Sequence, residues 1–149
     1  MGCSQSAAIP ARVAVPTGHT RICVIGFSMS HNVGRAAKLA NAIASAHPDK
    51  YETWFYFGKF REQGGLLETV KAELTADDQK NFAEHKTAPF CWLETDDGGR
   101  QGIGGRDRLC EWAAAEFPDD SAVLALANTP PSKKPWKGDL FPSSTKPTC

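Results

Sequence analysis

The five cysteines are the residues best suited to redox or metal chemistry, and their spacing argues against both. Cys3, Cys23, Cys91, Cys110 and Cys149 are widely scattered, and no two of them form a Cys-x-x-Cys pair. Dithiol redox motifs and zinc ribbons both need such a pair. The three central cysteines lie within apolar segments, where a free cysteine behaves as a small buried hydrophobic residue. We therefore expect reduced, structural thiols in a cytosolic type of environment.

A second candidate for chemistry is the serine-containing turn at residues 26–31. Its sequence, Gly-Phe-Ser-Met-Ser-His, partly matches the Gly-x-Ser-x-Gly nucleophile elbow, but the final glycine is missing. His31 is next to Ser30 in sequence and is a poor partner for Ser28, so the pattern argues against a hydrolase. Ser30 precedes a helical pattern, and we predict that its hydroxyl caps that helix. The four histidines show no metal-ligand spacing, and no metal site is predicted.

The first residues match a lipidation pattern. Residues 1–6, Met-Gly-Cys-Ser-Gln-Ser, fit the N-myristoylation motif with Gly2 as the acceptor, and Cys3 beside it is suited to palmitoylation. Two acyl chains give stable attachment to a membrane, whereas one binds only marginally. The pattern therefore predicts peripheral membrane contact through an acylated N-terminus.

The last residues carry a candidate docking element. Trp136 lies in a segment rich in proline, where no local core can hold an indole, so we predict that it docks on a partner protein. The alternative is a tryptophan without a partner in a disordered tail. Lys133, Lys134 and Lys137 surround it and form a basic patch suited to an acidic surface.

Length and composition predict one domain of ordinary size with two flanking segments. The chain has 149 residues, of which 41% are hydrophobic, and its 17 basic and 17 acidic residues balance, which argues against nucleic-acid binding. The apolar runs are too short to span a bilayer, and no stretch near Met1 resembles a secretory signal, so we expect a cytoplasmic protein. We predict an arm at residues 1–19, a folded domain at 20–127 and a Pro-rich tail at 128–149.

Hydrophobic periodicity within that domain predicts strands alternating with helices. The predicted strands cover residues 21–27, 51–57, 89–93 and 101–103. The predicted helices cover 33–44, 66–74 and 106–117, and residues 75–78, beginning with Thr75, are predicted to form the capped start of a further helix that runs to about His85. A parallel pair joined by a helix, followed by an antiparallel hairpin and a covering helix, predicts an α/β fold. Its sheet is central, mixed and four-stranded, with helices on both faces.

Three local motifs accompany this order. Thr87-Ala88-Pro89 opens the third strand, Gly104-Gly105-Arg106-Asp107 precedes the last helix, and Ser30-His31-Asn32-Val33 begins the first helix. Together they resemble the proline loop, the Gly-Gly-x-Asp turn and the Cys-Pro-Tyr-Cys site of the glutaredoxin and thioredoxin family, with both thiols replaced.

The resemblance covers residues 21–117 and implies a three-layer α/β/α fold in which Pro89 is cis. It also implies that Thr87, Ala88 and Pro89 would pair with the cysteinyl part of glutathione. Gly104, Gly105 and Asp107 would receive its glutamyl end.

A closer likeness lies in residues 85–92 (HKTAPFCW) and 98–105 (GGRQGIGG). These segments are similar to the glutaredoxin-like N-terminal part of the B-type malate-dehydrogenase-like proteins of ciliated cells. The sequence does not extend into their dehydrogenase domain. This likeness implies an association with cilia or flagella.

We therefore predict a non-enzymatic, redox-inactive protein with an interaction or structural role and no cofactor. The resemblance implies that its partners are other proteins of a cytoskeletal, ciliary or flagellar (axonemal) assembly. The alternative is a glutathione-binding protein or weak glutathione transferase. In that case the hydroxyl of Ser30 would donate to the glutathione thiolate.

Overall fold

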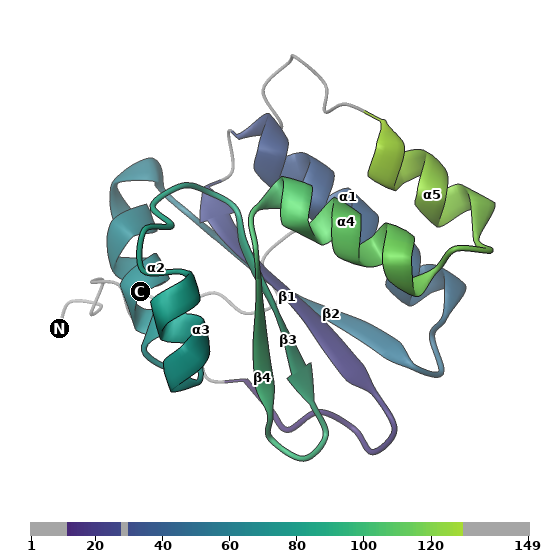
Figure 1. Cartoon of the computed structure of the whole chain (residues 1–149), viewed down its shortest axis with the longest axis horizontal. Coiled ribbons are helices and arrows are strands. Elements are labelled where there is room, and N and C mark those ends of the chain that lie inside the picture. Colours follow the sequence, from purple (N-terminus) through teal and green to yellow (C-terminus); the bar gives the residue numbers. More distant parts are fainter. Residues whose placement is uncertain (1–11, 28–29, 130–149) are drawn as a thin grey trace, which may run out of the picture.

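The computed structural model describes residues 12–27 and 30–129, which fold as a sheet covered by helices on both faces (Figure 1). The strands are β1 (Thr20–Phe27), β2 (Tyr51–Gly58), β3 (Phe90–Thr95) and β4 (Arg100–Gly104). The helices are α1 (His31–Ala46), α2 (Gln63–Lys71), α3 (Ala76–Asn81), α4 (Arg106–Glu116) and α5 (Ser121–Asn128), with a short 3-10 turn, Phe60–Glu62, before α2.

The sheet has the order β2-β1-β3-β4. β1 pairs with β2 in parallel and with β3 antiparallel, and β3 and β4 form an antiparallel hairpin. Gly98, whose φ is +87°, makes the turn between β3 and β4, a conformation that glycine adopts without steric cost. The predicted mixed four-stranded α/β sheet is confirmed.

Side chains alternate between two cores, one on each face of the sheet. On β1, Ile22 and Val24 pack beneath α1, α4 and α5, whereas Cys23 and Ile25 face α2. Figure 1 shows α1, α4 and α5 on one face and α2 and α3 on the other. This three-layer arrangement is compatible with the layering of the thioredoxin fold.

Several helix limits differ from the predicted ones. α1 begins at His31, inside the predicted turn, because Ser30 caps it. α3 ends at Asn81 rather than near His85, and residues 82–89 form a loop whose carbonyls bond to side chains instead. α5 was not predicted, although Asp120 before an Ala/Val/Leu run is an N-cap signal, and its carboxylate accepts from the amide of Val123 at 3.1 Å.

A charged cluster ties residue 12 of the predicted arm to the sheet. Glu94 accepts hydrogen bonds from Arg12 at 2.7 Å, from Arg21 at 3.2 Å and from the Trp92 indole at 3.0 Å. The Arg12 guanidinium lies 5.2 Å from the ring centroid of Trp54, within cation–π range. Arg12 is therefore part of the folded domain.

Candidate functional site

The start of α1 carries no thiol. The hydroxyl of Ser30 accepts a hydrogen bond from the amide of Val33 at 3.4 Å, which confirms the predicted cap. Val33 is fully buried, and a Cβ added to Gly26 would lie only 2.5 Å from its Cγ2. The two positions where the resemblance places cysteines are thus a helix cap and a core residue.

The cysteines within the described residues lie away from solvent. Cys23 and Cys91 are fully buried, and Cys110 is 9% exposed. Burial in apolar surroundings raises the pKa of all three thiols, because it disfavours the thiolate. Since the thiolate is the reactive form, none of these cysteines is set up as a nucleophile.

The loop before β3 is held by the side chain of His85, which belongs to the loop, and by that of Lys71 from α2. The bond between Ala88 and Pro89 is cis, as the resemblance implies. The Nε2 of His85 lies 2.9 Å from the carbonyl of Thr87 and 3.3 Å from that of Pro89, so Nε2 must carry the proton. The buried ammonium of Lys71 donates to the carbonyls of Ala83 and His85, both at 3.3 Å. These contacts fix the course of the loop.

In contrast to these carbonyls, the backbone groups of Ala88 are not bound by any side chain of the described residues. Within the part of the chain that the structure describes, neither its N–H nor its C=O has a hydrogen-bond partner. Peptide ligands often bind by pairing with such main-chain groups next to a strand. Ala88 therefore offers one donor and one acceptor to a ligand with an extended backbone.

The glycine-rich turn brings α4 against this loop. Gly104 has a φ of +119°, which favours glycine, and it directs the chain from β4 into α4. A Cβ on Gly105, the N-cap residue, would lie 3.4 Å from His85 and 3.7 Å from the carbonyl of Pro89. These distances place the first turn of α4 directly beside the proline loop.

A pocket of about 390 Å³ opens between these segments. It brings together five of the seven predicted ligand residues: Thr87, Ala88, Pro89, Gly105 and Asp107. Ser30 and Gly104 do not line it. The pocket is also lined by three residues that were not predicted: Asn32 in the first turn of α1, and Arg106 and Arg108 in the first turn of α4. Each of them is at most two positions from a predicted residue.

The charges around this pocket favour a carboxylate. The amides of the first turn of α4 lack a side-chain cap and carry the positive end of the helix dipole. The guanidinium of Arg106 lies 2.8 Å from the carboxylate of Asp107, and Arg108 contacts Glu111 at 3.4 Å. The guanidinium groups of these two arginines and the open amides of α4 offer hydrogen-bond donors to a carboxylate.

The remaining predicted sites lie outside the described residues. These are the acylation candidates Gly2 and Cys3, and the docking candidates Lys133, Lys134, Trp136 and Lys137. Among the residues that are described, no group of three or more His, Cys, Asp or Glu side chains is placed to hold a metal ion. No helix in that part of the chain is long and apolar enough to cross a membrane.

Comparison with known proteins does not assign a family to this chain. No protein-family model matches it, and a search of curated proteins finds no significant match.

Proposed function

We propose that this chain is a redox-inactive, glutaredoxin-like binding protein. It holds an extended ligand that bears a carboxylate and performs no thiol chemistry on it. One observation carries the proposal: the pocket keeps an unpaired backbone at Ala88 and an open helix start at Gly105, while Ser30 and Val33 stand where thiols would be needed.

A non-enzymatic interaction role follows from this combination. A ligand can pair with the backbone of Ala88 and place its carboxylate at the first turn of α4, but the described cysteines are too buried to attack it. The resemblance alone suggests a ciliary or flagellar (axonemal) assembly with cytoskeletal partner proteins, and we include that setting in the proposal.

Calorimetric titration with glutathione and with S-methylglutathione tests the binding step. We expect both to bind with a Kd below about 1 mM, equivalent to about 4 kcal/mol, and within about threefold of each other, because no thiol chemistry contributes. An absence of binding by both peptides would overturn the pocket assignment.

Arg106→Ala tests the position of the ligand carboxylate. We expect this variant to weaken glutathione binding about tenfold, which corresponds to about 1.4 kcal/mol for a lost charge-assisted contact. Arg61→Ala removes an exposed arginine that does not line the pocket and should leave the Kd unchanged.

Two activity assays address the enzymatic alternatives. We expect no glutathione-dependent reduction of a mixed disulfide and no conjugation of glutathione to an electrophilic aromatic halide. Conjugation that is lost in Ser30→Ala would instead support the glutathione transferase alternative.

A further inference from the structure

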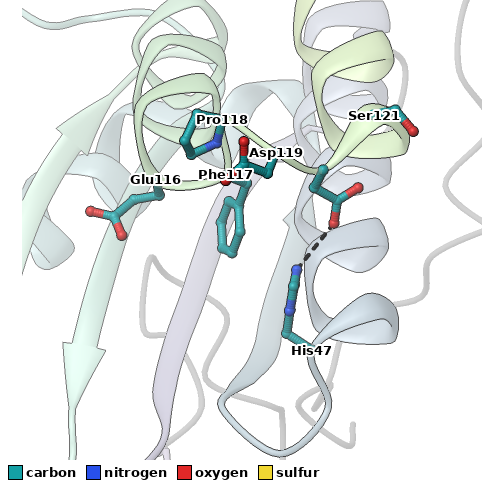
Figure 2. Close-up of a pocket in the computed structure, with 7 residues that line it drawn as sticks. His47, Glu116, Phe117, Pro118, Asp119 and Ser121 are labelled. Atoms are coloured by element: carbon teal, nitrogen blue, oxygen red, sulfur yellow. Dashed lines mark hydrogen bonds and ion pairs between the residues drawn. The ribbon is translucent and has the colours of Figure 1, made fainter.

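A second pocket, of about 470 Å³, lies at the far end of α4 from the first one (Figure 2). It is formed where α1 ends, where α4 ends and where α5 begins. Its volume is within the range of binding pockets for small molecules and side chains. Nothing in the proposed function uses it.

The floor of this pocket is aromatic. The ring of Phe117 stacks on that of His47, with centroids 4.8 Å apart and planes 23° apart. Tyr51 and Trp112 also contact Phe117 edge-on, with ring centroids 5.4 and 6.0 Å from its own. Such a floor accepts the flat face of another aromatic ring or a cation.

The rim of the pocket is acidic. Asp120 is already engaged, since one oxygen caps α5 and the other lies 3.1 Å from Nε2 of His47. Glu116 and Asp119 are exposed, and within the described residues their carboxylates have no hydrogen-bond or ion-pair partner. Figure 2 shows the ring of Phe117 between the carboxylate of Glu116 and the ring of His47.

This surface needs a ligand that combines an aromatic ring with positive charges. The chain itself carries such a segment: Lys133, Lys134 and Lys137 surround Trp136 in residues 130–149. The segment follows α5, and α5 begins at the pocket. The eight residues of α5 rise about 12 Å. The extended chain from Thr129 to Trp136 spans up to roughly 23 Å, which is enough to return along α5.

We propose that residues 130–149 dock in this pocket of their own domain. Trp136 lies on the ring of Phe117, and the neighbouring lysines face the carboxylates of Glu116 and Asp119. This contact keeps Trp136 covered until a partner protein competes with the pocket for Trp136. The pocket therefore regulates when Trp136 and its neighbouring lysines can bind a partner.

Nuclear magnetic resonance of the ¹⁵N-labelled full chain tests this docking. The indole signal of Trp136 is assigned by its loss in Trp136→Phe, and the buried indole of Trp92 is the internal standard. We expect the heteronuclear NOE of Trp136 to approach that of Trp92 at low salt. In Glu116→Lys/Asp119→Lys it should fall to the value of a freely moving side chain.

A charge exchange separates a specific contact from a general effect of charge. Adding Lys133→Glu/Lys134→Glu to Glu116→Lys/Asp119→Lys should restore at least half of the lost NOE. Asp77→Lys/Glu84→Lys makes the same change in net charge at exposed positions in or beside α3 and should leave the NOE unchanged.

Three outcomes would overturn the proposal. The first is a freely moving Trp136 in the unaltered chain, and the second is an ordered Trp136 in Glu116→Lys/Asp119→Lys. The third is an NOE that falls on tenfold dilution, because the occupant would then be the tail of a second copy.

Discussion

Glu94 is the residue on which the charges at the N-terminal end of β1 converge. Its side chain is 7% exposed. Its carboxylate forms ion pairs with Arg12, Arg21 and, at 3.4 Å, Arg100, and it accepts a hydrogen bond from the indole of Trp92. Burial alone would raise the pKa of this carboxyl. The hydrogen bond from Trp92 and the charge of Arg12 outweigh burial and lower the pKa below its ordinary value.

Glu94→Gln removes the charge that the buried arginines require. We expect the free energy of unfolding to fall by about 3 kcal/mol, because breaking a buried ion pair leaves an uncompensated charge. Denaturant titration measures the change. Glu84→Gln, at an exposed position, should change the free energy of unfolding by less than about 0.5 kcal/mol, and a similar loss there would contradict the explanation.

The same carboxyl predicts a pH dependence. Because the folded-state pKa of Glu94 is lowered, its contribution is present above the unfolded-state pKa of about 4.3 and is lost as the pH falls through the folded-state pKa. The difference in melting temperature between the unaltered chain and Glu94→Gln should therefore shrink below about pH 4. A difference that stays constant down to pH 2 would assign the effect to packing instead.

At the scale of elements, β1 and α1 meet through a contact that leaves no room for a side chain. Gly26 lies on β1, and a Cβ there would be 2.5 Å from Cγ2 of Val33 in the first turn of α1. This close approach sets where the start of α1 stands relative to the proline loop. The geometry of the candidate pocket thus depends on a glycine outside it.

Gly26→Ala should destabilise the fold by about 1–3 kcal/mol, because the added methyl group forces β1 and α1 apart. Gly64→Ala is the matched control. It lies near the start of α2 with nothing within 4 Å of the added Cβ, so we expect it to stabilise the protein by about 0.4–1 kcal/mol. Thermal unfolding compares the two variants, and equal effects would count against the steric explanation.

At the scale of the whole molecule, the two cores place the central cysteines beyond the reach of solvent. Cys91 belongs to the core under α1, α4 and α5, and Cys23 belongs to the core under α2. Only the opening of a whole face of the sheet can expose either thiol. The labelling rate of Cys91 therefore measures the opening of the core under α1, α4 and α5, and that of Cys23 measures the opening of the core under α2.

Thiol labelling of Cys3→Ser/Cys149→Ser checks this prediction, because only the three central cysteines remain. We expect slow labelling in the native state, at rates that rise with denaturant in parallel with the unfolded fraction. Cys110, which is 9% exposed, should react before the other two. Fast labelling of Cys91 in the native state would instead mark it as a nucleophile beside the proline loop.

The order of strands and helices followed from the sequence, because alternating apolar residues and capping residues act over a few positions. Ser30 and Thr75 cap helices as such local signals predict. α5 was missed although Asp120 signals its start, since eight residues give little helical periodicity.

Tertiary structure alone decided which predicted residues meet. Residues near Ala88 and Gly105 are close because β4 returns beside β3, and Asn32 joins them because the antiparallel pairing of β1 with β3 brings the start of α1 to the start of β3. The second pocket likewise joins His47 to Asp120, which lie 73 positions apart. Local sequence determines each helix and strand, but these distances depend on how buried faces pack against one another.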